Sequence, residues 1–413
     1  MVKQSSIFIF SVCFLFSCDS PVDAPKQTTF DRSDFGAKFQ AINANHFKPP
    51  TLSKIEGSYK YNGNAIWGAT GRDRQGKIYF GVSNLVNPES SAYLYQLDPN
   101  TQDINLQSDT VSQLKQSGKF TLGMGQNKLH SKFYQASDGY LYFSSFDEQG
   151  ESNSRIPQYG GVLWRKLPER NEWEFVFSSD EALIALNSNG RYVYALGYWG
   201  HVLYQYDTEL DSMRKIAVGS IPGHISRNFL VNRDGHVFIP KVYGEEPMVE
   251  LVEYSPKLHQ VNTFPFDGYT HQGVFSNHGI VSYVNMKNGD IYFMTATGIL
   301  HRIEQTKNGR SKVVNLGSLD ENGGNTYVGA LFSPDGAEMI VGLGRDHGDT
   351  NYYWILYNIA ANTSVKYPIL DVDLKGHLLY GSFTTDNNGN FYIVGSDRRD
   401  NSKHYPVIFK ASY

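Results

Sequence analysis

A short hairpin pattern recurs seven times along the chain, and this repeat constrains the fold more than any other feature of the sequence. Each copy places a glycine at a tight turn and follows it with a strand of aromatic or branched residues. Glycine suits such a turn because it adopts positive φ without a steric penalty. A period of about fifty residues is typical of propellers and solenoids. The turn glycines are Gly76, Gly139, Gly190, Gly235, Gly289, Gly336 and Gly389, with spacings of 63, 51, 45, 54, 47 and 53 residues.

A third strand with an alternating pattern follows each hairpin, for instance at residues 201–207. In six copies a more polar strand comes next, such as residues 261–266, whereas the seventh copy stops at Tyr413 without one. A lone strand beginning near Thr51 can complete this last blade and remove its open edge. The sequence therefore predicts an all-β fold, a seven-bladed β-propeller closed by an N-terminal strand.

Composition supports a folded, strand-rich chain. Hydrophobic residues make up 40% and aromatic residues 14% of the 413 residues, which is not the profile of a disordered protein. One four-stranded blade has two apolar faces and no core of its own, so a closed ring is needed to bury both faces. The formal net charge is −4 and no basic run occurs, which argues against a nucleic-acid partner.

The N-terminus has the pattern of an export signal. Residues 1–17 combine Lys3 with an apolar run, and the segment Leu15–Cys18 resembles a bacterial lipoprotein processing box. We expect Cys18 to be lipidated and residues 18–50 to tether the propeller, residues 51–413, to a bacterial membrane at the cell surface or in the periplasm. The alternative is an ordinary cleaved signal in which Cys18 is incidental.

The sequence indicates no required cofactor. Both cysteines, Cys13 and Cys18, lie in the first eighteen residues, so the folded part has no disulfide framework and no thiolate metal ligands. Residues 371–376 superficially resemble a calcium loop, but Lys375 occupies a ligand position. We predict no catalytic metal, leave a structural divalent metal open, and expect a monomer.

Candidate site residues follow from the geometry of a propeller. The segment leading into each innermost strand and the loop between the second and third strands share one face, where ligands usually bind. The lead-in segments supply Trp67, His130, Lys132, His224, Arg227 and His271, and the loops supply Tyr198, Trp199, His201, Tyr243 and Arg345.

Each of these residues also has a purely structural interpretation. His130 could be a strand-end histidine bonded to a backbone carbonyl, and Tyr198 with Trp199 could cap a blade. Arg227 and Arg345 could form salt bridges between blades. The functional interpretation rests on convergence, because histidine, tyrosine, arginine and lysine on neighbouring blades are the residue types needed to abstract a proton next to a carboxylate.

That chemistry is β-elimination in an acidic polysaccharide. The proton α to a uronate carboxylate becomes acidic when positive charge neutralises the carboxylate, so an arginine or a protonated histidine must bind it. A neutral histidine or tyrosine then removes the proton, and a second such group protonates the leaving glycosidic oxygen.

Three motifs carry a resemblance to a known family. Lys128–Lys132, Gly160–Trp164 and the Gly-Tyr-Trp-Gly-His loop at 197–201 resemble those of the propeller-type ulvan lyases, polysaccharide lyase families 24 and 25. The resemblance implies cleavage next to a uronic acid in a sulfated polysaccharide.

The same resemblance implies roles for individual residues. It assigns His130, Tyr198, Arg227 and His271 to catalysis, with Arg214 as the alternative arginine. We expect Lys132, Trp67, Trp199, His201, His224, Tyr243 and Arg345 to bind substrate.

Two other classes of function are compatible with the sequence. One is a non-catalytic surface propeller that binds glycans or proteins, because this fold hosts both kinds of function. The other is a lactonase-like metal-dependent hydrolase in which His201, His224 and His271 meet, although sequence-distant histidines without a close-spaced pair are a weak metal signal.

Overall fold

The computed structural model describes residues 48–57, 65–86, 89–123, 125–147, 160–198, 200–221, 223, 225–244, 248–267, 279–305, 309–320, 326–346, 351–399 and 404–413. All of them belong to one compact unit, Ala37–Tyr413. The secondary structure of these residues is almost entirely antiparallel strand, as the hairpin repeat predicts. The export signal, Cys18 and the tether lie outside the described residues.

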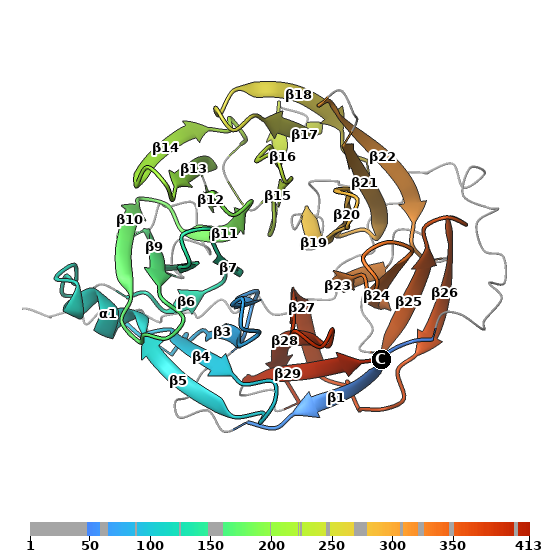
Figure 1. Ribbon diagram of the computed structural model, residues 1–413, viewed down its shortest axis with the longest axis horizontal. Coiled ribbons are helices and arrows are strands. Elements are labelled where there is room, and N and C mark those ends of the chain that lie inside the picture. The colour runs from blue at the N-terminus through green and yellow to red at the C-terminus, as the bar shows by residue number, and fades with distance from the viewer. Residues whose placement is uncertain are drawn as a thin grey trace, which may run out of the picture. The chain divides into compact units, whose positions relative to one another are not determined.

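Five separate four-stranded sheets stand radially around a common centre (Figure 1). Four of them follow chain order: β11 (Leu183–Ser188), β12 (Tyr192–Gly197), β13 (Val202–Asp207) and β14 (Ser212–Ala217); β15 (Leu230–Val231), β16 (Val237–Tyr243), β17 (Met248–Tyr254) and β18 (Gln260–Pro265); β19 (Ile280–Asn285), β20 (Ile291–Thr295), β21 (Ile299–Gln305) and β22 (Ser311–Ser318); and β23 (Thr326–Phe332), β24 (Met339–Asp346), β25 (Tyr352–Asn358) and β26 (Thr363–Pro368).

The fifth sheet joins the two ends of the described chain. It contains β27 (His377–Thr385), β28 (Phe391–Asp397), β29 (Tyr405–Ser412) and, outermost, β1 (Thr51–Ile55). β1 pairs antiparallel with β29, from Thr51 opposite Ser412 to Ile55 opposite Ile408 (Figure 1). The closing strand predicted from the N-terminus is therefore present.

The remaining strands form one nine-stranded sheet. They are β2 (Thr70–Arg72), β3 (Ile78–Val82), β4 (Tyr93–Leu97), β5 (Ile104–Asp109), β6 (Lys128–Leu129), β7 (Phe133–Gln135), β8 (Leu141–Phe146), β9 (Gly161–Lys166) and β10 (Glu174–Ser179). A short helix, α1 (Thr110–Gln116), follows β5, and the Asp109 side chain caps it by accepting from the Ser112 N–H at 2.9 Å.

The prediction of seven separate blades is wrong in this respect, because the structure has five four-stranded blades and this larger sheet. β2 and β7 join its two halves by parallel pairing, with Gly71 opposite Phe133. A Cβ atom at residue 71 would lie 2.2 Å from the Phe133 carbonyl oxygen, so only glycine lets the two strands approach this closely. That close approach turns two expected blades into one continuous sheet.

Apolar clusters between neighbouring sheets form the core. Between β11–β14 and β15–β18, for example, Tyr194, Leu203, Phe229 and Val252 are all buried in one cluster. The innermost strands carry small or branched buried residues near the centre, such as Ala185 on β11. This burial on both faces of each sheet fixes the inner strand ends, from which the site is built.

Candidate functional site

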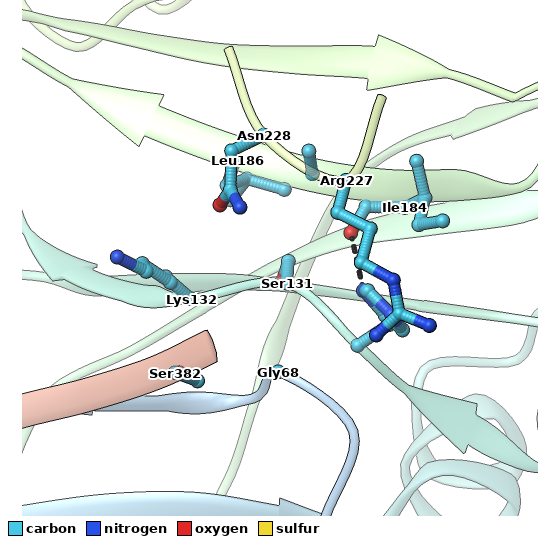
Figure 2. Close-up of a pocket in the computed structure, with 10 residues that line it drawn as sticks. Gly68, Ser131, Lys132, Ile184, Leu186, Arg227, Asn228 and Ser382 are labelled. Carbon is cyan, nitrogen blue, oxygen red and sulfur yellow. Dashed lines mark hydrogen bonds between the residues drawn. The ribbon is translucent and has the colours of Figure 1, made fainter. Parts of the chain in front are cut away.

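A small cavity opens where the inner strands of several sheets begin (Figure 2). The room inside it for a water-sized group is about 10 Å³, which is enough for no more than one water molecule. Its lining comes from the segment before β2, the β6–β7 connection, β11, the segment before β15, and β27. The lining residues are Gly68, His130, Ser131, Lys132, Ile184, Ala185, Leu186, Arg227, Asn228 and Ser382.

The segment His130–Lys132 reaches this cavity because it breaks the strand ladder. β6 and β7 both pair with β8, but the three residues between them make no ladder pairs. The Ser131 hydroxyl takes the place of the missing backbone partner by accepting from the Ser144 N–H at 2.8 Å. Such an interruption redirects side chains away from the normal alternation of a strand. Two candidate residues therefore face the cavity from one short segment.

His130 is buried, with 5% of its surface exposed, and its ring is fixed by one hydrogen bond. Its Nδ1 atom lies 3.1 Å from the carbonyl oxygen of Ile184 on β11, drawn as a dashed line in Figure 2. A carbonyl oxygen can only accept, so Nδ1 carries the proton and Nε2 is the basic nitrogen of the neutral ring. This tautomer has the form required of a general base. The carbonyl bond is also the structural role that the sequence allowed.

Lys132 lies beside two aromatic rings in the interior of the ring of sheets. Its Nζ atom is 4.1 Å from the ring centroid of Tyr283 on β19 and 5.3 Å from that of Phe383 on β27. Burial lowers the pKa of Lys132 to about 8. Cation–π contacts contribute about 0.5–2 kcal/mol, whereas removing a charge from water costs several kcal/mol, so the rings do not restore a normal pKa.

Arg227 reaches the cavity from the segment before β15. Its neighbours anchor this segment to β19: the Asn228 amide donates to the Ile280 and Val281 carbonyls at 3.2 and 3.1 Å, and the Ser226 hydroxyl accepts from the Ile280 N–H at 2.9 Å. Figure 2 shows the Arg227 and Lys132 side chains on either side of Ser131 in this view. The structure thus brings together one histidine and two cations that were predicted on the lead-in segments of two different blades.

Tyr198 does not line this cavity. Only 2% of its surface is exposed, and its ring packs in the apolar cluster between β11–β14 and β15–β18 with Leu196, Val218 and Phe229. The prediction of Tyr198 as a catalytic tyrosine is not supported by this placement, because a ring in the core cannot reach a polymer. The structural alternative, that it caps a blade, fits the observed packing.

The Gly-Tyr-Trp-Gly-His loop has a structural explanation in Glu181. The buried Glu181 carboxylate accepts from the Gly200 N–H at 2.9 Å, and a Cβ atom at residue 197 would lie 2.5 Å from the same carboxylate oxygen. Burial raises the pKa of Glu181. His201 in this loop is 3% exposed and has a φ of 52°, so it is also part of the packed interior rather than an accessible binding residue.

The other predicted binding residues that the structure describes lie outside the cavity lining. Trp67 is half-buried, and the Lys128 Nζ atom lies 4.7 Å from its ring centroid. Tyr243 is half-buried at the end of β16, where a hydrogen bond with Glu250 raises its pKa. Arg345 on β24 lies 5.4 Å from the ring centroid of Tyr327.

Arg214, the alternative arginine, is exposed on the outer strand β14. There it donates to the Pro256 carbonyl oxygen at 3.0 Å and to the Gln205 side chain, remote from the cavity lining. Of the two arginines, only Arg227 lines the cavity. Three further predicted residues, Trp199, His224 and His271, lie outside the described residues.

A pair of tyrosines that the sequence did not predict lies next to Lys132. The hydroxyl groups of Tyr134 on β7 and Tyr283 on β19 are 2.5 Å apart, and the Asn187 amide on β11 donates to Tyr283 at 3.1 Å. Burial raises the pKa of Tyr283 to about 12 and that of Tyr134 well above its usual value. The sequence carried no signal for this pair, because the two tyrosines are 149 residues apart.

No cluster of three or more histidine, cysteine, aspartate or glutamate side chains suited to a metal occurs within the described ranges. Among those same residues, no helix is long and apolar enough to span a membrane.

Comparison with known proteins supports the fold alone. No family model and no curated protein matches the chain. The solved structure of U3-55K is 9% identical with a TM-score of 0.55, covering 89% of this chain and 100% of that one. Hydrazine synthase from Kuenenia stuttgartiensis is 10% identical with a TM-score of 0.51, covering 82% and 95%. The β-propeller domain of the Trilobed protease from Pyrococcus furiosus is 10% identical with a TM-score of 0.47, covering 85% and 94%.

Identities near 10% carry no information on activity or ligand. The radial sheets and the closure of the last one by β1 define the class: the chain is an all-β protein with a β-propeller fold.

Proposed function

We propose that this protein is a polysaccharide lyase that cleaves an anionic, uronate-containing glycan of the ulvan type by β-elimination. One observation supports this most directly: His130, in the tautomer of a base, shares a cavity with the cations Arg227 and Lys132. No carboxylate side chain is among the described residues that line it. Such a lining favours an anionic ligand, and we assign proton abstraction to the neutral His130 ring beside it.

In the proposed reaction, Arg227 binds the uronate carboxylate and so stabilises the negative charge that develops when the neighbouring proton leaves. The Nε2 atom of His130 takes that proton. The electron pair forms a carbon–carbon double bond, and the carbon–oxygen bond to the leaving sugar breaks. Protonation of the leaving oxygen needs a second histidine or tyrosine. Because Tyr198 is in the core, His271 is the predicted donor.

The test is activity of the purified chain on ulvan and on other uronate polymers, followed by the ultraviolet absorbance of the unsaturated product. We expect His130→Ala to lower kcat at least about 100-fold, because a general base contributes roughly that much. His259→Ala is the matched control, since His259 is exposed and remote from the cavity. Full activity of His130→Ala would refute the site, and inactivity of the wild type on every uronate would refute the lyase.

A second candidate is a non-catalytic propeller that binds glycans. The narrow cavity and the burial of Tyr198 favour it, because a polymer lyase needs an accessible groove with two proton-transferring groups. Retention of the chain on ulvan without release of unsaturated product would select this function.

We also propose that the nine-stranded sheet counts as two blades, which gives the ring seven. The strands of its halves, β2–β5 and β6–β10, pair with each other at only two parallel positions, and the apolar cluster containing Tyr79, Leu129 and Trp164 lies between them as other clusters lie between separate sheets. Inner strands of neighbouring blades run in the same direction, so parallel pairing is expected where they meet.

A further inference from the structure

Lys132 has an unusual environment for a lysine inside a protein. Its ammonium lies over the rings of Tyr283 and Phe383, and no carboxylate of the described residues forms an ion pair with it. Charged groups removed from water are normally paired with an opposite charge. A cation that is held by aromatic rings and faces a cavity is therefore suited to an anion from outside the chain.

Three strands fix the position of the Tyr283 ring that contacts this cation. Tyr283 on β19 is held from two sides, by the Tyr134 hydroxyl on β7 at 2.5 Å and by the Asn187 amide on β11 at 3.1 Å. Asn187 is in turn anchored by donating to the Phe229 carbonyl at 2.9 Å. A flexible lysine gains a defined place for its charge from such a support, because the rings restrict where the ammonium can lie.

The tyrosine pair also joins two sheets beside Lys132. The hydrogen bond between Tyr134 and Tyr283 bridges strands of two different sheets. The cavity that Lys132 lines has room for about one water-sized group. Only a single atom of a ligand group, such as one oxygen of a pendant oxyanion, therefore fits beside Lys132.

We propose that Lys132, with Ser131 and Ser382 lining the same cavity, forms an oxyanion subsite that receives one oxygen atom of an acidic group of the glycan while Arg227 binds another group. The identity of the ligand as a glycan rests on the proposed function, but the binding of free anions does not. The two sources of this chemistry are a sulfate ester and a second uronate carboxylate. The cavity lining supplies hydroxyl donors suited to either, since the Ser131 and Ser382 side chains both line it.

Binding at this subsite depends on pH in a defined direction. The pKa of Lys132 is about 8, so the charge that attracts an anion is lost as the pH rises through 8. The groups that face it are His130 and Arg227 across the cavity and the tyrosines Tyr134 and Tyr283, whose raised pKa values keep both neutral in this range. We expect sulfate affinity to fall about tenfold between about pH 7 and about pH 9.

The experiment is calorimetric titration of the full chain with sodium sulfate and, separately, sodium glucuronate, against sodium chloride at equal ionic strength. We expect Lys132→Met to weaken binding at least about tenfold. Lys132→Arg should bind at both pH values without the decline. Lys215→Met is the matched control, because Lys215 also lies over an aromatic ring, that of Tyr204, but on the exposed strand β14.

Binding of both anions, of sulfate alone or of glucuronate alone supports the subsite and identifies its source. Wild-type protein that binds neither anion better than chloride overturns the proposal, as does a folded Lys132→Met variant that binds as tightly as wild type. Near-ultraviolet circular dichroism checks the fold of each variant, and Lys132→Arg keeps the test decisive if Lys132→Met does not fold. Anion binding through Lys132 in a chain without lyase activity would refute the proposed function and leave the subsite intact.

Discussion

Two buried histidines, His301 and His130, have different surroundings. These surroundings suit His301 to a structural role and His130 to a role in ligand binding or catalysis. His301 stacks on Phe293 with ring centroids 5.0 Å apart and meets the edge of Phe266 at 5.6 Å, so its ring is packed like an aromatic residue. His130 instead has one nitrogen bonded to a carbonyl and borders a cavity. The sequence singled out His130 as a candidate because it lies where a strand begins. The packing supports this choice, since His130 borders the cavity whereas His301 is enclosed by aromatic rings.

The His301 environment predicts a pH-dependent loss of stability. Burial lowers the pKa of His301 to about 4, so the unfolded chain binds its proton more readily than the folded chain. This contribution is fully present above about pH 6.5 and is lost as the pH falls towards 4, at a cost of about 3 kcal/mol in the free energy of unfolding. Denaturant unfolding between these pH values measures it, and His301→Phe should flatten the slope. Equal slopes in both proteins would contradict the assignment.

At the scale of elements, the last sheet differs from the other four-stranded sheets because its outermost strand, β1, is not consecutive with the rest. β1 supplies a fourth strand from the far end of the sequence, and the Leu52 N–H donates to the Asp371 carboxylate at 3.1 Å. Leu52 and Ile55 of β1 are both buried and pack in two different apolar clusters, so both faces of the strand contact the core. The ring is thereby closed by noncovalent pairing of the two ends of the propeller.

This closure predicts opposite outcomes for adjacent residues of β1. Leu52 is 1% exposed and packs in the cluster shared with β23–β29, whereas Ser53 points outward. We expect Leu52→Ala to lower the free energy of unfolding by about 2–5 kcal/mol. Ser53→Ala should change it by less than about 0.5 kcal/mol. Chemical denaturation of the two variants compares them, and equal effects would show that β1 is not part of the cooperative unit.

At the scale of the whole molecule, positive charge is concentrated at the cavity although the net charge is negative. The net charge is −4, yet the cavity at the centre is lined by two cations and no described carboxylate. A local concentration of positive charge on a mildly acidic protein favours binding of an anionic group at that point over nonspecific adsorption of polyanions.

We propose that the N-terminal segment anchors this propeller to a membrane through Cys18. We expect the wild type expressed in a bacterium to incorporate labelled palmitate and to partition with detergent, because acyl chains provide the anchor. Cys18→Ser should lose both properties. Cys13→Ser, the chain's other cysteine, is the control and should keep them. Labelling of Cys18→Ser at the wild-type level would exclude lipidation at this residue.

The sequence alone determined the all-β class, the propeller and its closure by β1, because turn glycines, strand alternation and a missing last strand are local patterns that recur. It also placed His130, Lys132 and Arg227 at strand entries, and the fold brings these to one cavity. The Gly-Tyr-Trp-Gly-His motif at 197–201 was less informative about function, because its glycines accommodate the buried Glu181 carboxylate.

The tertiary structure decided what depends on distances between sheets. Whether β2 and β7 join into one sheet depends on how closely Gly71 lets Phe133 approach, and no pattern within either strand records that distance. The burial of Tyr198 and the meeting of Tyr134 with Tyr283, 149 residues apart in sequence, depend in the same way on the curvature of the ring. Side-chain pattern specifies each strand, whereas packing between strands distant in the chain decides which residues share a site.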